Sequence, residues 1–162
     1  MKHLRMVSVV AWVILMCLSS GYCGESVLLT PVMVSFVDPI QLPFDDSDVA
    51  GVRIDILYGK CRDLYGLDIG VVNHATGSET GLAVGIVNYV GKDFTGLQIG
   101  VANYATRAQA FQIGVFNGAE DICGMQIGVI NTTRLMRGCQ LGLVNVIRNS
   151  DLEFLPVFNC FF

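Results

Sequence analysis

The chain has 162 residues, of which 52% are hydrophobic and 15% charged, and its formal net charge is −4. This length allows one domain of ordinary size. The acidic balance, without any Lys/Arg cluster, gives no electrostatic reason to bind nucleic acid or an anionic membrane surface, so we expect no nucleic-acid partner.

The first predicted element is an N-terminal leader, residues 1–21. Lys2 and Arg5 make a basic start, residues 6–18 are an apolar run apart from Ser8, and small residues follow up to Gly21. This pattern is typical of a secretory signal peptide, and an apolar run this short does not span a membrane comfortably. Its removal leaves eight basic and fourteen acidic residues, so the exported chain carries 8 − 14 = −6.

Five cysteines follow the leader, and export permits disulfides. Their spacings match no zinc or haem motif, so we expect neither metal nor cofactor. Cys123 and Cys139 lie one repeat plus two residues apart, so stacking of repeats could bring them together. An odd count leaves at least one thiol free or paired between chains. The five are Cys23, Cys61, Cys123, Cys139 and Cys160.

Residues 22–50 are predicted to form an N-terminal strand and an acidic link that cap the repeats. The segment 26–36 is apolar and rich in strand-forming residues, and Pro31 inside it suits an edge strand. The segment 38–48 combines two prolines with several aspartates, which is typical of a turn-rich, solvated link.

Residues 51–162 form a tandem repeat domain. The phrase Gly-Leu-Asp-Ile-Gly-Val-Val-Asn at 66–73 returns five times, with its central glycine at steps of 15, 15, 14, 14 and 14 residues. A degenerate copy precedes these at 51–58, and another ends at Asn159 with Pro156 in the glycine position. A short fixed period indicates stacked small units, not a globular enzyme with one pocket. The central glycines are Gly70, Gly85, Gly100, Gly114, Gly128 and Gly142.

Side chains within each phrase alternate with period two, and β-branched residues are frequent, which predicts strands. Burying each aliphatic side chain is worth about 1.5–3 kcal/mol, so stacked copies would place like on like in apolar columns. For the copy at 96–103 we expect one face to point inward and the glycines and Gln98 to lie on a flat outer face. The inward set would be Leu97, Ile99, Val101 and Asn103.

The predicted fold class is all-β, with two ways to use the period. In a β-solenoid each unit of 14–15 residues makes one coil. In the alternative, an antiparallel meander closes into a small outer-membrane β-barrel, which the alternating aromatic residues near the C-terminus would suit. The connectors hold 7, 7, 6, 6, 6 and 6 residues, without the alternation of short and long loops typical of barrels, which favours the solenoid.

Two rows of amides follow from stacking. The repeated asparagine is predicted to form a structural ladder at a corner of the coil, made of Asn73, Asn88, Asn103, Asn117, Asn131 and Asn145. The repeated glutamine is predicted to form a row on the outer face. That row is either a candidate interaction stripe for recognition or self-association, or an amide ladder covered by the N-terminal segment. It consists of Gln98, Gln112, Gln126 and Gln140.

The segment 48–73 and the phrase Gly-Leu-Gln-Ile-Gly-Val-Ala-Asn at 96–103 resemble a family of exported bacterial proteins, the leptospiral-type surface-repeat proteins. The resemblance covers about Val32 to the C-terminus. It implies a location at the cell surface or outer membrane of a Gram-negative bacterium, and it implies no activity, cofactor or binding residue. The chain departs from the pattern at Ala110 and Pro156, so we expect a weakened register near the end.

His74 is the only histidine after the leader, and we expect it to be exposed in a connector, without a nucleophile or metal beside it. The sequence therefore predicts a non-enzymatic envelope protein that acts as a structural or adhesive scaffold. A small outer-membrane barrel or pore is the alternative. The partner would be an unidentified surface or envelope component, with self-association and membrane association as further candidates.

Overall fold

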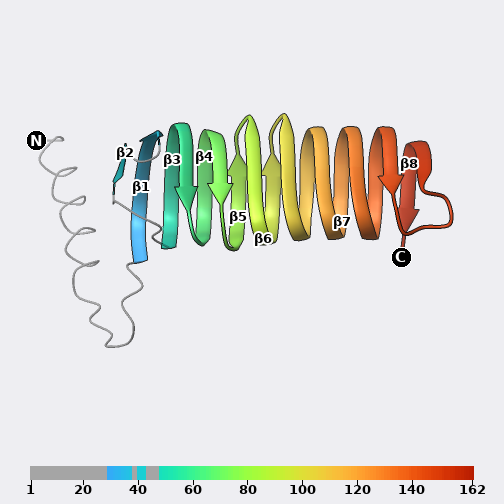
Figure 1. The fold of residues 1–162 in the computed structure, drawn as a ribbon, viewed down its shortest axis with the longest axis horizontal. Helices are drawn as coiled ribbons and strands as arrows, with labels where there is room; N and C mark the ends of the chain where they lie inside the picture. Colours follow the sequence, from blue (N-terminus) through green and yellow to red (C-terminus); the bar gives the residue numbers. More distant parts are fainter. Residues whose placement is uncertain (1–28, 38–39, 43–47) are drawn as a thin grey trace, which may run out of the picture.

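The structure, a computed structural model, describes residues 29–37, 40–42 and 48–162. Within these ranges the chain winds into a single β-solenoid whose flattened coils stack along one axis (Figure 1). The all-β solenoid predicted from the period is confirmed. The antiparallel meander is wrong, because successive repeats pair in parallel. The predicted leader, residues 1–21, lies outside the described residues.

The strands follow one another in the sheet in the same order as in the sequence, except that β2 lies outside β1 and that β4 also pairs with β6. Such an order arises when each coil lies directly on the preceding one. The long strand β7 winds through several coils without a break. The strands are β1 (Leu29–Val37), β2 (Ile40–Leu42), β3 (Asp48–Cys61), β4 (Leu64–Ala75), β5 (Glu79–Val84), β6 (Val87–Ile99), β7 (Ala102–Ile147) and β8 (Phe154–Phe161).

The register places equivalent repeat positions side by side. Gly51 pairs with Gly66, and the same column continues through the leading residue of each phrase as far as Ala110. Ala110 stays in register with Gly96 and is buried, so the weakened register predicted at this position is wrong. The degenerate copy at 51–58 is a true coil with one irregularity between Asp55 and Tyr58.

Glycine is required at two corners of the coil. Gly96 has φ +139°, and a Cβ there would run into the carbonyl oxygen of Gly81 on the preceding coil. At Gly100 a Cβ would point inward. It would lie 2.7 Å from the side-chain nitrogen Nδ2 of Asn88 and 2.7 Å from the backbone carbonyl oxygen of Gly85. The backbone of one coil can therefore approach the next closely only where the side chain is absent.

The interior is narrow and partly polar. Its apolar part consists of two columns on the side of the coil away from the repeated phrases, and both are fully buried or nearly so. One column is Cys61, Ala75, Val90, Ala105, Ala119 and Ile147. The other is Leu64, Phe94, Ala108, Ile122 and Met136. The two columns together fill the apolar side of the interior, coil by coil.

The two ends of the solenoid differ. At the N-terminal end β1 pairs in parallel with β3, so it extends the repeat stack, and β2 pairs antiparallel with β1. At the C-terminal end β8 pairs antiparallel with the last coil of β7, with Asn159 opposite Gln140. The sequence predicts that this segment is a further repeat copy, and that prediction is wrong: the chain reverses direction after residue 147.

Candidate functional site

The outer face of the repeated phrases is aliphatic. The structure reverses the predicted orientation, because the Ile and Val positions point outward and the Gln positions point inward. Side chains on this face are exposed by 37% at Ile99 and by as much as 68% at Leu143. Its exposed members include Ile54, Ile69, Ile86, Ile99, Val101, Ile113, Val115, Val129, Leu141 and Leu143. We call this surface the aliphatic face.

The reversal has a local cause. Strict alternation would put Gln98 and Asn103, five residues apart, on opposite faces. The chain instead bends at Gly100 and Val101. The bend shifts the alternation by one residue, so that the side chains of Gln98 and Asn103 both point inward. Ile99 and Val101 then flank the bend on the outside.

The aliphatic face is continuous along the solenoid. Its central column runs in register from Val34 in β1 through Ile54 and Ile113 to Phe158 in β8. A shallow groove of about 720 Å³ lies over the central glycines, between the column that contains Ile113 and the column that contains Val115. The lining of this groove is almost entirely apolar. Contiguous apolar surfaces of this kind mark interaction sites.

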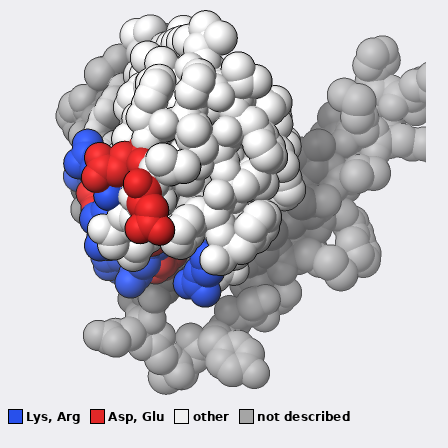
Figure 2. Space-filling model, turned by 90° about the vertical axis from the view of Figure 1, so that its right-hand side faces the viewer, with Lys and Arg blue, Asp and Glu red and all other residues white. Residues whose placement is uncertain are grey.

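Charged side chains lie at the opposite corner of the coil. Arg107 is seven residues after Gly100 and seven before Gly114, so it lies half a coil away from the aliphatic face. It pairs with Asp93 on the preceding coil at 2.6 Å, and Arg134 pairs with Asp121 at 2.8 Å. Figure 2, viewed along the axis from the β8 end, shows the charges gathered on one side and an uncharged surface over the rest. The solenoid is therefore amphipathic in cross-section.

The four glutamines form a hydrogen-bonded ladder inside the solenoid. Gln112 donates to Gln98 at 2.8 Å, Gln126 to Gln112 at 2.8 Å, and Gln140 to Gln126 at 2.7 Å. All four are fully buried. The predicted outer stripe is therefore wrong in its position, and these residues offer no surface to a partner. Each rung satisfies a polar group that would otherwise be costly to bury.

The six asparagines form the predicted ladder, and it is buried. Asn73, for example, donates to Asn88 at 2.8 Å and also to the carbonyl of Val84 at 3.1 Å. The same pair of bonds recurs up the stack, and the ladder closes at Asn145, which donates to Gly142. These bonds tie the corner of each coil to the next, so the asparagines are structural.

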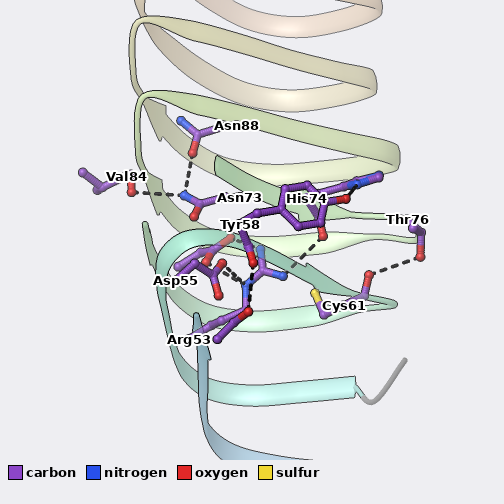
Figure 3. Close-up of polar contacts among 11 residues, drawn as sticks. Arg53, Asp55, Tyr58, Cys61, Asn73, His74, Thr76, Val84 and Asn88 are labelled. Atoms are coloured by element: carbon purple, nitrogen blue, oxygen red, sulfur yellow. Dashed lines mark hydrogen bonds and ion pairs between the residues drawn. The ribbon is translucent and has the colours of Figure 1, made fainter. Parts of the chain in front are cut away.

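A buried ionic cluster replaces the glutamine ladder in the first coils (Figure 3). Arg53 and Asp68 occupy the glutamine column, and the guanidinium donates from Nε to Asp68 Oδ1 at 2.8 Å and from Nη2 to Asp68 Oδ2. Nη1 also donates to the carbonyl of His74 at 3.3 Å. Asp55 forms an ion pair with Arg53, at 3.1 Å from Nε, but its oxygens accept no hydrogen bond. Glu79 is buried nearby.

One guanidinium faces three buried carboxyl groups, and burial shifts the pKa values of two of them, Glu79 and Asp55. Burial raises the pKa of Glu79 to about 8, and the negative charge of Asp68 adds to the shift. Burial also raises the pKa of Asp55 to about 7 against the opposing charge of Arg53. Burial alone would lower the pKa of Arg53, but its hydrogen bonds to Asp68 raise it overall. The cluster therefore retains protons near neutral pH.

His74 begins a short aromatic column on the outside of the coils. Its Nδ1 lies 2.6 Å from the hydroxyl of Tyr58, and its ring meets Tyr89 edge to face at 5.0 Å. Tyr89 stacks on Tyr104 at 5.3 Å. Burial, followed by the charges of Lys60 and Arg53, lowers the pKa of His74. The prediction that His74 is an exposed connector residue is wrong, because it is half-buried in this column.

Two cysteines form a disulfide at the C-terminal end. Cys139 in the last coil is bonded to Cys160 in β8, so the pairing of Cys123 with Cys139 is wrong. Cys61 and Cys123 are free thiols, the first buried and the second exposed. Burial raises the pKa of the Cys61 thiol to about 12, so this cysteine is a packing residue and not a nucleophile.

Within residues 29–37, 40–42 and 48–162 no group of three or more His, Cys, Asp or Glu side chains could hold a metal ion. The same part of the chain contains no helix long and apolar enough to cross a membrane. Comparison of the chain with protein-family models, with curated proteins and with solved structures gave no match. The resemblance drawn from the repeat phrase therefore stays a prediction.

Sequence reasoning missed the aliphatic face and the ionic cluster. The signal for the cluster was present, since Arg53, Asp55 and Asp68 interrupt phrase positions that are small, apolar or amide in later copies. The signal for the face was the five-residue spacing between Gln and Asn, which breaks strict alternation. The predicted metal-free and cofactor-free character of the site remains a prediction.

Proposed function

We propose that this chain is an exported, non-enzymatic repeat protein that acts as a structural or adhesive scaffold in the cell envelope of a Gram-negative bacterium. The observation that carries the proposal is the aliphatic face, which runs the length of the described solenoid and is exposed within it. Stacked repeats commonly provide extended binding surfaces, and a large apolar patch on such a surface marks a site of contact.

The location follows from the sequence. The leader at residues 1–21 predicts export, and the resemblance of the repeat phrase implies the outer membrane or cell surface. The acidic charge of the exported chain provides no electrostatic attraction for nucleic acid. The non-enzymatic role rests on the lack, in the sequence after the leader, of a histidine placed with a nucleophile or a metal motif.

Cell fractionation combined with surface proteolysis tests this proposal. We expect the protein in the outer-membrane or surface fraction of the cells that make it, without its leader, and we expect protease added to intact cells to remove it. A periplasmic marker protein should survive the same treatment. Recovery of the chain with its leader in the cytosol would contradict the proposal.

A further inference from the structure

We infer that two copies of this chain pack against each other through the aliphatic face and form a face-to-face homodimer. The inference rests on the proposed scaffold function and deepens it, because it names the occupant of the same surface. Three observations carry it: the size of the face, its shape and the position of the charges.

The face approaches the size of a stable dimer interface. From Val34 to Phe158 the central column crosses eight steps between neighbouring strands, which at about 4.8 Å each gives a length of about 38 Å. Its width from Leu97 to Val101 is four residues, or about 13 Å. The projected area is therefore about 500 Å², and the accessible area is larger because the side chains protrude. Stable interfaces bury about 800 Å² on each partner.

The shape of the face complements itself. Two parallel ridges, one containing Ile113 and the other Val115, border the groove over Gly114 and its equivalents. A two-fold axis perpendicular to the face would lay the ridge of one copy in the groove of the other, and the same patch would serve on both copies. The ridges are straight because the coils are stacked in register, so the fit extends along the groove from Ile99 to Leu143.

The charges favour a second copy over a lipid surface. Proteins that lie on a membrane usually place Lys or Arg beside the apolar face, where they reach lipid phosphates. Here the column that contains Arg107 lies half a coil away, and both Arg107 and Arg134 are already paired with acids of neighbouring coils. The chain is acidic as a whole. An aliphatic surface with few basic residues beside it is suited to an equally aliphatic protein surface.

Sedimentation velocity of the purified protein over a range of concentrations tests the inference. We expect a dimer for the unchanged protein and a monomer for Ile113→Glu, because each dimer would bury two like charges in an apolar interface. Leu135→Glu is the matched control: Leu135 is 38% exposed and Ile113 39%, but Leu135 lies in the column of Arg107, away from the face. This control should remain a dimer. Val115→Glu, at a position 49% exposed, is a second variant of the face.

Circular dichroism identifies which variants keep their strands. If either Ile113→Glu or Val115→Glu is folded, its sedimentation tests the inference. A monomeric unchanged protein at all concentrations would overturn the inference, as would folded face variants that dimerise as well as Leu135→Glu does. Flotation with neutral phosphatidylcholine vesicles tests lipid as the alternative occupant. If the unchanged protein is a monomer that floats with the vesicles, and Ile113→Glu does not float, the face binds lipid and the inference is overturned. Failure here leaves the cellular location untouched, so it is distinguishable from failure of the proposed function.

Discussion

Amide side chains determine how each coil meets the next. A buried Gln or Asn without partners would be costly, but stacking gives every rung a carboxamide on the neighbouring coil, as between Gln112 and Gln126 at 2.8 Å. Isolated repeats cannot satisfy these groups. The same residue choice therefore disfavours a single coil and favours a long stack, which links the polar interior to the repetition of the sequence.

The buried acids of the first coils make stability depend on pH. Glu79 has its pKa raised from 4.5 to about 8 in the folded chain, and Asp55 from 3.8 to about 7. At a pH between the unfolded and the folded pKa value of each acid, the folded state holds a proton that the unfolded chain has lost. Folding is therefore favoured at the acidic end of the window, and its stability falls as the pH rises through the folded pKa values.

We predict that the urea midpoint falls between about pH 5 and about pH 8, and that Glu79→Gln reduces this fall. The variant should be more stable than the unchanged protein at the alkaline end, because its neutral amide does not have to lose a proton in the buried site. Glu153→Gln, at an exposed position, should leave the profile as it was. A midpoint that rises with pH in this window would contradict the prediction.

Residue identity alone did not show which side of the strand is buried. Ile and Val are usually buried and Gln usually exposed, and those averages favour the wrong orientation here. The orientation depends on the bend at Gly100 and on the amide partners of the next coil, neither of which a single phrase contains. The asparagine ladder could be predicted because it depends only on register. Register also places Arg53 beside Asp68, whereas the approach of Asp55 to Arg53 and the burial of Glu79 depend on the fold of the first coils.

The terminal strands protect the ends of the stack. A parallel solenoid ends in an edge strand whose backbone groups could pair with another chain. At the C-terminal end β8 covers that edge in the antiparallel direction, and the disulfide from Cys139 to Cys160 holds it there. The outer edge of β8 is interrupted by Pro156 and by Val157, which has φ +70°. Such irregular edges pair poorly, which limits end-to-end association.

We predict that Cys160→Ser destabilises the protein and loosens β8. The disulfide links residues 21 apart, and closure of a loop of that size is worth about 3 kcal/mol in the chain-entropy account. Urea unfolding should show the loss, and backbone hydrogen exchange should place it in β8 and the last coil. Cys123→Ser, which removes an exposed free thiol, should change neither measurement. Equal stability of the two variants would count against β8 as a cap.

Among the elements, the N-terminal strand and the repeats follow from local patterns, whereas the addition of β2 outside β1 and the direction of β8 do not. The segment that ends at Asn159 has the alternation of a repeat, although Leu152 and Pro156 stand where the phrase has glycine. Its reversal depends on the turn at 148–153 and on a disulfide between distant cysteines. Cysteine pairing cannot be deduced from sequence alone.

At the scale of the whole molecule, a nearly constant period determines the architecture. Uniform steps of 14–15 residues predict parallel stacking, and the parallel pairing of successive repeats agrees with that. The stack then multiplies each repeat position into a column. One column set gives the buried amides, another the aliphatic face and a third the charged corner. The amphipathic cross-section is thus a direct result of repetition.

The solenoid keeps amides inside and aliphatic side chains outside. Hydrogen exchange of side-chain carboxamides, followed by NMR, tests this directly, and dimer formation does not obscure it because the amides lie within one chain. We predict slow exchange for the NH₂ groups of Gln112, Gln126 and Asn117, which are fully buried, and fast exchange for the exposed Gln109 in the same spectrum. Exchange at Gln112 and Gln126 as fast as at Gln109 would contradict the account.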